Sequence, residues 1–308
     1  MEPHRNRPAA AVNPRAAWAR KTRGPRVLGL WLFLPSVAVT LSFSLYPVAY
    51  AVFTSLYKAP YMHRGAFVGL ANYIHFIANP AARASIVHSL VFVFGSLVVA
   101  LPLGTALALA LNKRFFGKSL LQAFIILPWV ITLVVVGLLW GWLLNPQYGL
   151  IAYIGSLFGL QFSPLSNPIG AMMSLITASV WQSYPYAFLL VLAALQSIPN
   201  ELYEAAAVDG ARPWHAFFYI TLPELRSTLL VVMIVLGMHY FNVVTLPLIM
   251  TDGGPFGSTN MISLEVFHQA FTSYRTGYAS AIAVYMFMFN AVFSVIYFLS
   301  LRKGYAEA

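Results

Sequence analysis

Glu204-Ala205-Ala206-Ala207-Val208-Asp209-Gly210 is a charged, helix-prone stretch between two long apolar runs, and after nine intervening residues it is followed by Ile220-Thr221-Leu222-Pro223. The charged residues in and around it are Glu201, Glu204, Asp209, Arg212 and Glu224. Alanine and glutamate favour helix, glycine favours a helix end, and proline favours a helix start. The stretch therefore predicts a short helix from Leu202 to Val208, a break at Gly210 and a second helix that begins near Pro213.

The composition of the chain is that of a membrane protein. Of its 308 residues, 60% are hydrophobic and only 8% are charged, whereas about a quarter of the residues in a soluble domain are charged. The absence of cysteine excludes disulfides, thiolate metal sites and a cysteine nucleophile. The net charge of +10 is not accompanied by a basic patch interleaved with aromatic residues, so we expect no nucleic-acid partner.

Six charge-free runs are each long enough for the roughly 20 residues that cross a bilayer as a helix. They are Val27–Tyr50, Ile86–Leu111, Leu120–Leu144, Ile169–Leu195, Leu229–Met250 and Ala279–Leu301. Most contain proline, at positions Pro35, Pro47, Pro102, Pro128, Pro185 and Pro247. Because neighbouring helices can satisfy the freed carbonyls, we expect kinks in a packed bundle at these prolines and no span ends. The predicted fold is an all-α membrane protein with six transmembrane helices.

The distribution of Lys and Arg orients these spans. With the N-terminus inside, the inner segments hold fourteen Lys and Arg residues (seven, three, two and two in chain order) and the outer loops hold four. We therefore expect both termini, and the loop over residues 199–226 between spans four and five, in the cytoplasm. The predicted domains are a flexible basic cytoplasmic tail over 1–26, a six-helix transmembrane domain over 27–301 and a cytoplasmic tail over 302–308. The basic inner segments would contact anionic membrane lipid.

The spacing Glu-Ala-Ala, three residues, Gly, nine residues, Ile-x-Leu-Pro resembles the cytoplasmic coupling loop of bacterial ABC importer permeases. All seven positions match, at Glu204, Ala205, Ala206, Gly210, Ile220, Leu222 and Pro223. The later Gly253-Gly254-Pro255 and Gly277-Tyr278-Ala279-Ser280-Ala281 look like the carbohydrate branch of the same family, the maltose-type inner-membrane permeases. The resemblance covers residues 27–301.

This resemblance implies a multi-pass transport subunit of the bacterial cytoplasmic (inner) membrane, and not an enzyme. The loop, including Asp209, would dock in a groove of a separate ATP-binding subunit, where Glu204 would pair with a cation. Gly210 would permit the turn, and Pro223 would end the loop before the fifth span. The implied partners are two copies of that subunit, a second permease that is a different chain, and an extracytoplasmic sugar-binding protein.

No cofactor is expected on this chain, because ATP and Mg would be held by the partner ATPase. Gly117-Lys118-Ser119 matches the last three positions of the phosphate-loop motif of ATP-binding proteins. That loop requires a glycine five positions before its Gly-Lys pair, but position 112 is asparagine. The residues from Leu120 onward form an apolar run, so we interpret the motif as part of a basic inner loop.

Polar side chains in spans four and five predict the substrate path, since they are costly in a membrane unless they face a cavity or another helix. The candidates are Ser179, Gln182, Ser183, His239, Tyr240 and Asn242. His239 and Asn242 share a helix face, and Tyr240 lies about 100° away. Neutral hydrogen-bonding groups beside aromatic rings suit a sugar, and the resemblance implies that these spans line the path. Interhelical hydrogen bonding is the alternative for each residue.

Three other functions stay open from the sequence. A permease for glycerol phosphate or another small solute is opposed only by the lack of a buried cation. An ion-coupled secondary transporter usually needs an acidic residue within a span, and the six runs contain none. A membrane enzyme or scaffold is disfavoured because no catalytic constellation or metal-binding spacing is present.

Overall fold

The computed structural model describes residues 24–63, 65–113, 115–159 and 162–306, and the regular elements among them are all helices. Residues 1–23, which make up most of the predicted basic tail, lie outside the described residues. The chain divides after Tyr50 into two compact units. The first unit contains most of α2 (Gly24–Ser55), which is helical through Pro35 and Pro47 and whose side chains from Phe33 onward are almost all exposed. Such an exposed apolar helix fits a membrane span.

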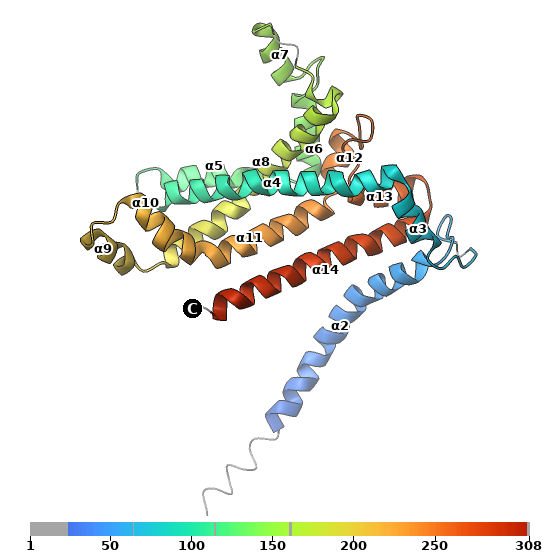
Figure 1. Cartoon of the computed structure of the whole chain (residues 1–308), viewed down its shortest axis with the longest axis horizontal. Helices are drawn as coiled ribbons and strands as arrows, with labels where there is room; N and C mark the ends of the chain where they lie inside the picture. The colour runs from blue at the N-terminus through green and yellow to red at the C-terminus, as the bar shows by residue number, and fades with distance from the viewer. Residues whose placement is uncertain (1–23, 64, 114, 160–161, 307–308) are drawn as a thin grey trace, which may run out of the picture. The chain divides into compact units, whose positions relative to one another are not determined.

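The second unit, from Ala51 onward, contains the remaining elements (Figure 1). They are α3 (Ala71–Ala78), α4 (Pro80–Asn112), α5 (Lys118–Val130), α6 (Leu133–Leu143), α7 (Leu150–Leu157), η1 (Pro164–Ser166), α8 (Pro168–Ser197), α9 (Asn200–Val208), α10 (Pro213–Ala216), η2 (Phe217–Thr221), α11 (Leu222–Asn242), α12 (Thr245–Met250), α13 (Ile262–Phe267), η3 (His268–Thr272) and α14 (Thr276–Ala306). The segment η1 is a 3₁₀-helix, and η2 and η3 are π-helical.

Five helical segments are long and apolar enough to cross a membrane, and a sixth is added if the bent pair α5 and α6 is counted as one span. Each predicted run overlaps one of these segments or the bent pair, so the all-α architecture is confirmed, and the number of candidate spans is five or six. The α4–α5 connection, α9 and the C-terminal end of α14 lie at one end of the second unit, while α3 and α13 lie at the other (Figure 1). The three segments of this unit that were predicted to be inner therefore share one end.

The core of the second unit is built on α8. In the most hydrophobic part of α8, 67% of the residues are buried, against 28% or less in the other four segments. The helix α4 packs along α8, and α11 lies between α4 and α14 (Figure 1). A Cβ atom placed on Gly104 would lie 2.6 Å from the Cβ of Ala187 and 2.9 Å from the backbone nitrogen of Phe188. The two helix backbones can approach this closely because position 104 has no side chain.

The third predicted span, Leu120–Leu144, is wrong as a single continuous helix. The chain bends by 95° between α5 and α6. Pro128 cannot donate the helical hydrogen bond to the carbonyl four residues earlier, which weakens the end of α5. The following β-branched pair, Ile131 and Thr132, adopts extended backbone angles and starts α6 in a new direction.

The fifth predicted span, Leu229–Met250, is also interrupted. The helix α11 ends at Asn242, and Val243 is extended before α12 begins at Thr245. Pro247 has no N–H for the carbonyl of Val243, which explains why the helix cannot continue smoothly. The hydroxyl of Ser263 donates instead to that carbonyl, at 2.6 Å. At Pro102 and Pro185, by contrast, α4 and α8 continue, as predicted.

The short helices α6 and α12 that result from these breaks pack against each other. A Cβ atom on Gly137 would lie 3.0 Å from the side chain of Ile249, whereas one on Gly141 would meet nothing within 4 Å. Gly137 thus marks a close helix contact, and Gly141 does not contribute to it.

Gly104→Ala is expected to destabilise the second unit, because the added methyl group would overlap Ala187 and the backbone of α8. Overpacking of this kind costs about 1–3 kcal/mol. Gly141→Ala is the matched control, since the space beside Gly141 is open. Thermal unfolding of the purified protein in mild detergent should show a lower midpoint for Gly104→Ala and an unchanged or higher one for Gly141→Ala. Equal midpoints would contradict the close packing of α4 and α8.

Candidate functional site

The helix predicted in the charged stretch is present as α9, and it starts two residues before the predicted Leu202. Its C-terminal end is closed by two backbone hydrogen bonds, from the Gly210 N–H to the Ala207 carbonyl at 3.1 Å and from the Ala211 N–H to the Ala206 carbonyl at 2.9 Å. This is the Schellman arrangement, which needs a left-handed residue after the helix. Gly210, with φ of +74°, supplies that conformation.

The second predicted helix begins at Pro213, as expected, and continues through α10, η2 and α11 to Asn242. Pro223 was expected to end the loop, and this expectation is wrong because Pro223 lies inside the first turn of α11. A proline in a helix removes one hydrogen bond and crowds the carbonyl four residues earlier. The chain widens into a π-turn over Phe217–Thr221, in which the Leu222 N–H bonds to the Phe217 carbonyl. A π-turn of this kind lets the helix pass the proline without ending.

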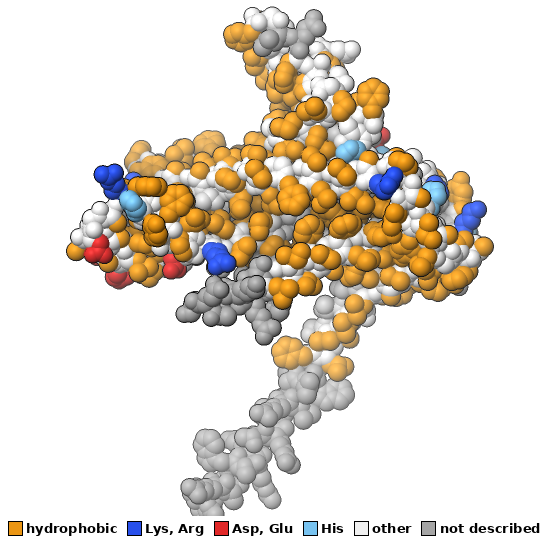
Figure 2. All heavy atoms as spheres, viewed as in Figure 1, with side chains coloured by type: hydrophobic (Ala, Val, Ile, Leu, Met, Phe, Trp, Pro, Cys, Tyr) orange, Lys and Arg blue, Asp and Glu red, His pale blue; other side chains and the backbone are white. Residues whose placement is uncertain are grey.

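The helix α9 projects from the second unit with seven of its nine residues exposed. Of the predicted docking residues, Glu204, Ala205, Asp209, Gly210 and Pro223 are exposed, and Ala206, Ile220 and Leu222 are half-buried. Acidic side chains gather around α9 on the face shown in Figure 2, next to the largely apolar surface of the bundle. The structure therefore presents Glu204 and Ala205 on a surface that another protein can contact.

One side chain ties α9 to the rest of the second unit. Tyr203 is half-buried against the apolar cluster around Leu195 and Leu225, and its hydroxyl lies 3.0 Å from Oγ1 of the buried Thr221. Thr221 also donates to the carbonyl of Ala216 at 3.4 Å. Neither residue was among the predicted site residues, although both stand within or beside the matched stretch. The hydroxyl pair links the short helix directly to the π-turn at the start of α11.

The candidate path residues fall into two groups. In the first, Ser179, Gln182, Ser183 and Tyr240 are buried, and Ser183 and Tyr240 meet where α8 contacts α11. The hydroxyl of Ser183 donates to the Ser179 carbonyl at 2.7 Å and accepts from the Tyr240 hydroxyl at 2.5 Å. The ring of Tyr240 packs edge-on against Phe92 of α4. For Ser183 and Tyr240 the structure supports the alternative interpretation, an interhelical hydrogen bond within the core.

In the second group, His239 and Asn242 are exposed on α11. Asn242 exchanges two side-chain hydrogen bonds with Asn290 of α14, at 3.1 and 3.2 Å. Sequence reasoning missed Asn290, although an amide within the apolar sixth run was a usable signal. His239, Asn242 and Asn290 thus form a neutral polar surface, named the amide face here, that can donate and accept hydrogen bonds.

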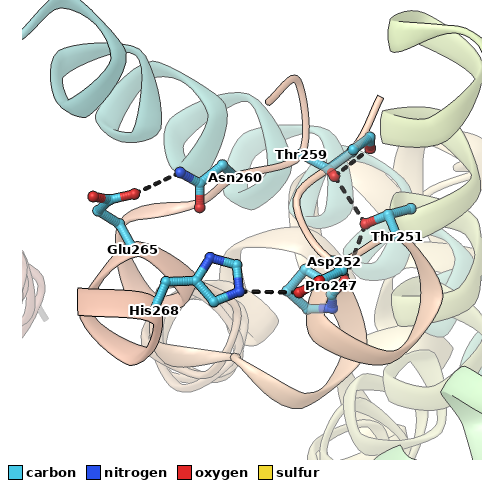
Figure 3. A network of polar contacts seen from close by, with 8 residues as sticks. Pro247, Thr251, Asp252, Thr259, Asn260, Glu265 and His268 are labelled. Carbon is cyan, nitrogen blue, oxygen red and sulfur yellow. Dashed lines mark hydrogen bonds and ion pairs between the residues drawn. The ribbon is translucent and has the colours of Figure 1, made fainter. Parts of the chain in front are cut away.

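The loop that carries the Gly-Gly-Pro motif is held by its own polar network (Figure 3). The hydroxyls of Thr251 and Thr259 are 2.8 Å apart, and Thr259 donates to the Gly254 carbonyl at 2.7 Å. Nε2 of His268 lies 2.9 Å from a carboxylate oxygen of Asp252. Within the described residues, no group of three His, Asp or Glu side chains is placed to hold a metal ion. The network is a structural feature of the loop.

Comparison with known proteins places this fold in a transport family. Residues 100–303 match the family model described as "Binding-protein-dependent transport system inner membrane component". The trehalose/maltose transport system permease protein MalF of Thermococcus litoralis is 34% identical over 272 residues, which cover 88% of this chain and 92% of that protein. The sn-glycerol-3-phosphate transport system permease protein UgpA of Yersinia enterocolitica is 34% identical over 272 residues, which cover 87% of this chain and 91% of that protein.

Among solved structures, a bacterial ABC transporter involved in the import of the acidic polysaccharide alginate has the same fold. The TM-score is 0.78 at 23% identity, with 94% of this chain and 99% of that chain covered. The family model spans well over half of the sequence, and the relatives match almost end to end. The chain therefore belongs to the family of inner membrane components of binding-protein-dependent transport systems, as a multi-pass permease subunit of an ABC importer.

Proposed function

We propose that this permease forms half of the membrane path for a sugar-containing solute, and that residues 199–226 dock it onto a separate ATP-binding subunit. The observation that carries the proposal is the exposed, capped helix α9. A nine-residue helix is too short to be stable by itself in water, and α9 leaves apolar side chains such as Val208, 88% exposed, without cover. A groove on a partner protein would cover these side chains and pair the charge of Glu204.

The proposed orientation places α9 in the cytoplasm, with six spans and both chain ends inside. The shared position of the α4–α5 connection, α9 and the end of α14 supports this topology (Figure 1). The excess of Lys and Arg in those segments selects that end as the cytoplasmic one. The predicted domain limits, 1–26, 27–301 and 302–308, are part of the same proposal.

The proposed mechanism uses α10, η2 and α11 as one lever. Movement of the docked α9 would pass through Tyr203 and Thr221 into the base of α11. Because α11 is continuous to Asn242, its far end, with the amide face, would turn with it. Rigid-body motion of this kind can alternate access to a site between the two sides of a membrane. The energy would come from ATP and Mg bound to two copies of the partner ATPase.

One docking loop per chain and two ATPases imply a second permease, which we propose is a different chain. An extracytoplasmic binding protein would deliver the solute. The alginate transporter has been solved in complex with a pentasaccharide-bound periplasmic protein, and its permease chain has the same fold at 23% identity. This supports the same arrangement for the present importer.

The chemistry of the amide face favours a neutral, hydroxyl-rich solute. His239, Asn242 and Asn290 supply donors and acceptors without a Lys or Arg. The names of MalF, for trehalose and maltose, and of SmoG from Agrobacterium fabrum, for sulfoquinovosyl glycerol, fit a sugar-containing solute. Glycerol phosphate is the second candidate, since UgpA is as similar as MalF in sequence identity. A bound phosphate would be stabilised by a nearby Lys or Arg, and the amide face has neither among the described residues.

Glu204→Lys is expected to abolish both transport and recovery of the ATP-binding subunit with the tagged complex, because the reversed charge would repel the docking groove. Lys113→Glu, a charge reversal at an exposed position outside residues 199–226, is the matched control and should retain both. Membrane abundance should be equal in the two variants. Normal uptake by Glu204→Lys at wild-type abundance would refute the docking proposal.

Tyr203→Phe is expected to keep the ATP-binding subunit bound and to lower the amount of solute imported per ATP hydrolysed. The variant loses only the hydroxyl that bonds to Thr221, a contact worth about 1 kcal/mol. Tyr219→Phe serves as control, because Tyr219 is 79% exposed on the same segment. The ratio of import to hydrolysis is measured in proteoliposomes. An unchanged ratio for Tyr203→Phe would show that the hydroxyl pair does not transmit the motion.

Asn242→Ala should raise KM for uptake about two- to tenfold, the effect of losing one or two neutral hydrogen bonds to the solute. Tyr240→Phe should instead lower thermal stability and leave KM unchanged, since its hydroxyl bonds within the core. Labelled maltose, trehalose and glycerol 3-phosphate, each offered with the importer's binding protein, are the probes. An increase of KM in Tyr240→Phe but not in Asn242→Ala would reverse the assignment of the two groups.

A further inference from the structure

Two loops that are distant in sequence form one surface patch, named the two-loop patch here, at the end of the second unit opposite α9 (Figure 1). Its residues are Lys58, Tyr61, Met62, Tyr274 and Arg275. Pro60 and Arg275 form an antiparallel bridge, and the Tyr61 N–H donates to the Tyr274 carbonyl at 2.9 Å. The rings of Tyr61 and Tyr274 stack with their centroids 5.0 Å apart. The loop after α2 and the loop before α14 are therefore joined to each other.

The start of α14 fixes this pairing. The hydroxyl of Thr276 donates to the Ala59 carbonyl at 2.6 Å, and the Gly277 N–H donates to the same carbonyl at 3.3 Å. A Cβ atom on Gly277 would lie 2.1 Å from the carbonyl oxygen of Tyr57, so only glycine allows this close approach. The patch is therefore held in one conformation by contacts within this chain.

Three side chains of the patch stand on strained backbone. Tyr61, Met62 and Tyr274 have φ of +50°, +62° and +54°, in the left-handed region that residues other than glycine seldom adopt. These side chains are 67%, 72% and 48% exposed, so burial within the chain does not explain the strain. Strained backbone of this kind is concentrated at functional sites. Exposed Tyr and Met beside Arg are the residue types that are enriched at protein–protein interfaces.

A cationic hollow of about 250 Å³ belongs to the same patch. It is lined by Lys58 and Arg275, which are exposed, and by His75 of α3. The guanidinium of Arg275 lies 4.9 Å from the centre of the Tyr278 ring, which supports it from below. In the part of the chain that the structure describes, no carboxylate lies within 4.0 Å of Lys58 or Arg275. The hollow therefore offers two cations to an anionic group from another molecule.

The shape of the hollow favours a carboxylate of a protein over a lipid. A guanidinium binds a carboxylate through two parallel hydrogen bonds, and a side chain of aspartate or glutamate needs no further cavity. A phospholipid would also need an apolar channel for its acyl chains. The remaining lining residues are short and form no such channel; they are Ala59, Pro60, Val68, Ala71, Asn72 and Gly277.

The hollow is also separate from the proposed solute path. Arg275 stands directly before α14 and precedes Asn290 by fifteen residues along the chain. This separation corresponds to about 22 Å at 1.5 Å per residue. A small solute on the amide face therefore cannot reach the cations, whereas a protein that covers this end of the unit can.

We propose that the two-loop patch docks an acidic surface of the extracytoplasmic binding protein, with one carboxylate held between Lys58 and Arg275. The inference rests on the proposed function, which supplies the binding protein and places this end of the second unit outside. Docking here would hold the binding protein at the outer end of α14, the helix that contributes Asn290 to the amide face.

The contact is tested by the stimulation of ATP hydrolysis in proteoliposomes that contain the intact importer and increasing amounts of its binding protein. Arg275→Gln should raise the half-maximal concentration of binding protein about tenfold, the effect of losing one close interfacial charge pair. Arg275→Glu should raise it further. The maximal rate, the basal rate and recovery of the ATP-binding subunit should stay unchanged, which a folding defect would not allow.

Lys113→Glu is the matched control, because it reverses an exposed cation at the opposite end of the unit, beyond α4. It should leave the half-maximal concentration unchanged. The concentration should also rise with NaCl in the wild type, since salt screens exposed charges, and should rise less in Lys58→Gln combined with Arg275→Gln. An unchanged half-maximal concentration in both Arg275 variants would overturn the proposal.

The occupant is identified by photocrosslinking in cells that import the solute. Benzoylphenylalanine replaces Met62 in the full chain, which is co-expressed with its partner subunits. The expected product joins this chain to the binding protein and disappears when Arg275→Glu is added. Reversal to lysine of the acidic residue nearest the crosslink should restore stimulation of the Arg275→Glu importer. A product with the second permease or with a phospholipid, or no product, would overturn the proposal.

These tests separate the docking surface from the proposed function. If Glu204→Lys abolishes transport but Arg275→Glu responds normally to the binding protein, the permease function stands and this surface is wrong. If Lys113→Glu weakens the response and Arg275→Glu does not, the proposed orientation is reversed, and this inference fails with it.

Discussion

The close contact of α4 with α8 is the constraint on which the second unit depends. Inside a bilayer, helices gain nothing by hiding apolar side chains from lipid, so they associate through tight backbone packing and interhelical hydrogen bonds. The side of α4 that meets α8 is accordingly lined with small residues at spacings of four, including Ala100, Gly104 and Ala108, all buried. This stripe lets α8 sit in the centre of the unit, where α5 and α11 also pack against it. The position of α11, and with it that of the continuous α10 and η2, follows from this arrangement.

The apolar runs in the sequence predicted the long helices, but they did not predict the breaks within Leu120–Leu144 and Leu229–Met250. Both sides of each break are apolar, and the prolines that weaken the helices, Pro128 and Pro247, resemble those at Pro102 and Pro185, where the helix continues. The difference lies in contacts distant in sequence. The freed carbonyl of Val243 is satisfied by Ser263 from α13, and Gly137 admits Ile249 between the displaced helices. Such contacts have no local signature, so they could not be predicted from the sequence.

The features of the candidate sites that depend on neighbouring residues in the sequence could be predicted, and those that depend on tertiary packing could not. The helix α9, its glycine end and the start at Pro213 depend on residues within a few positions, and all three are present. The prediction for Pro223 was wrong because the helix passes this proline through a π-turn, a rare feature that the sequence pattern does not reveal. The path residues depend on which helix each side chain faces, and this is a tertiary property. A periodic pattern places Tyr240 and Asn242 on different faces, but only the packing shows that Tyr240 is buried and that Asn242 meets Asn290.

The continuous α10–α11 helix has two exposed ends, and a rigid helix of this kind can transmit a displacement from one end to the other. The continuous segment Pro213–Asn242 has 30 residues, about 45 Å at 1.5 Å per residue, and this length exceeds the thickness of the hydrocarbon core, about 30 Å. Its π-turn is joined to α9 through Thr221, and its last residue belongs to the amide face. In the proposed mechanism, a displacement applied at α9 would therefore reach the far side of the membrane without crossing a flexible joint, apart from the π-turn itself. Because the π-turn lies next to the contact with Tyr203, any bending would be confined to the base of the lever. In this proposal the break after Asn242 would limit the motion to α11, so that α12 could remain packed on α6 while the amide face turned.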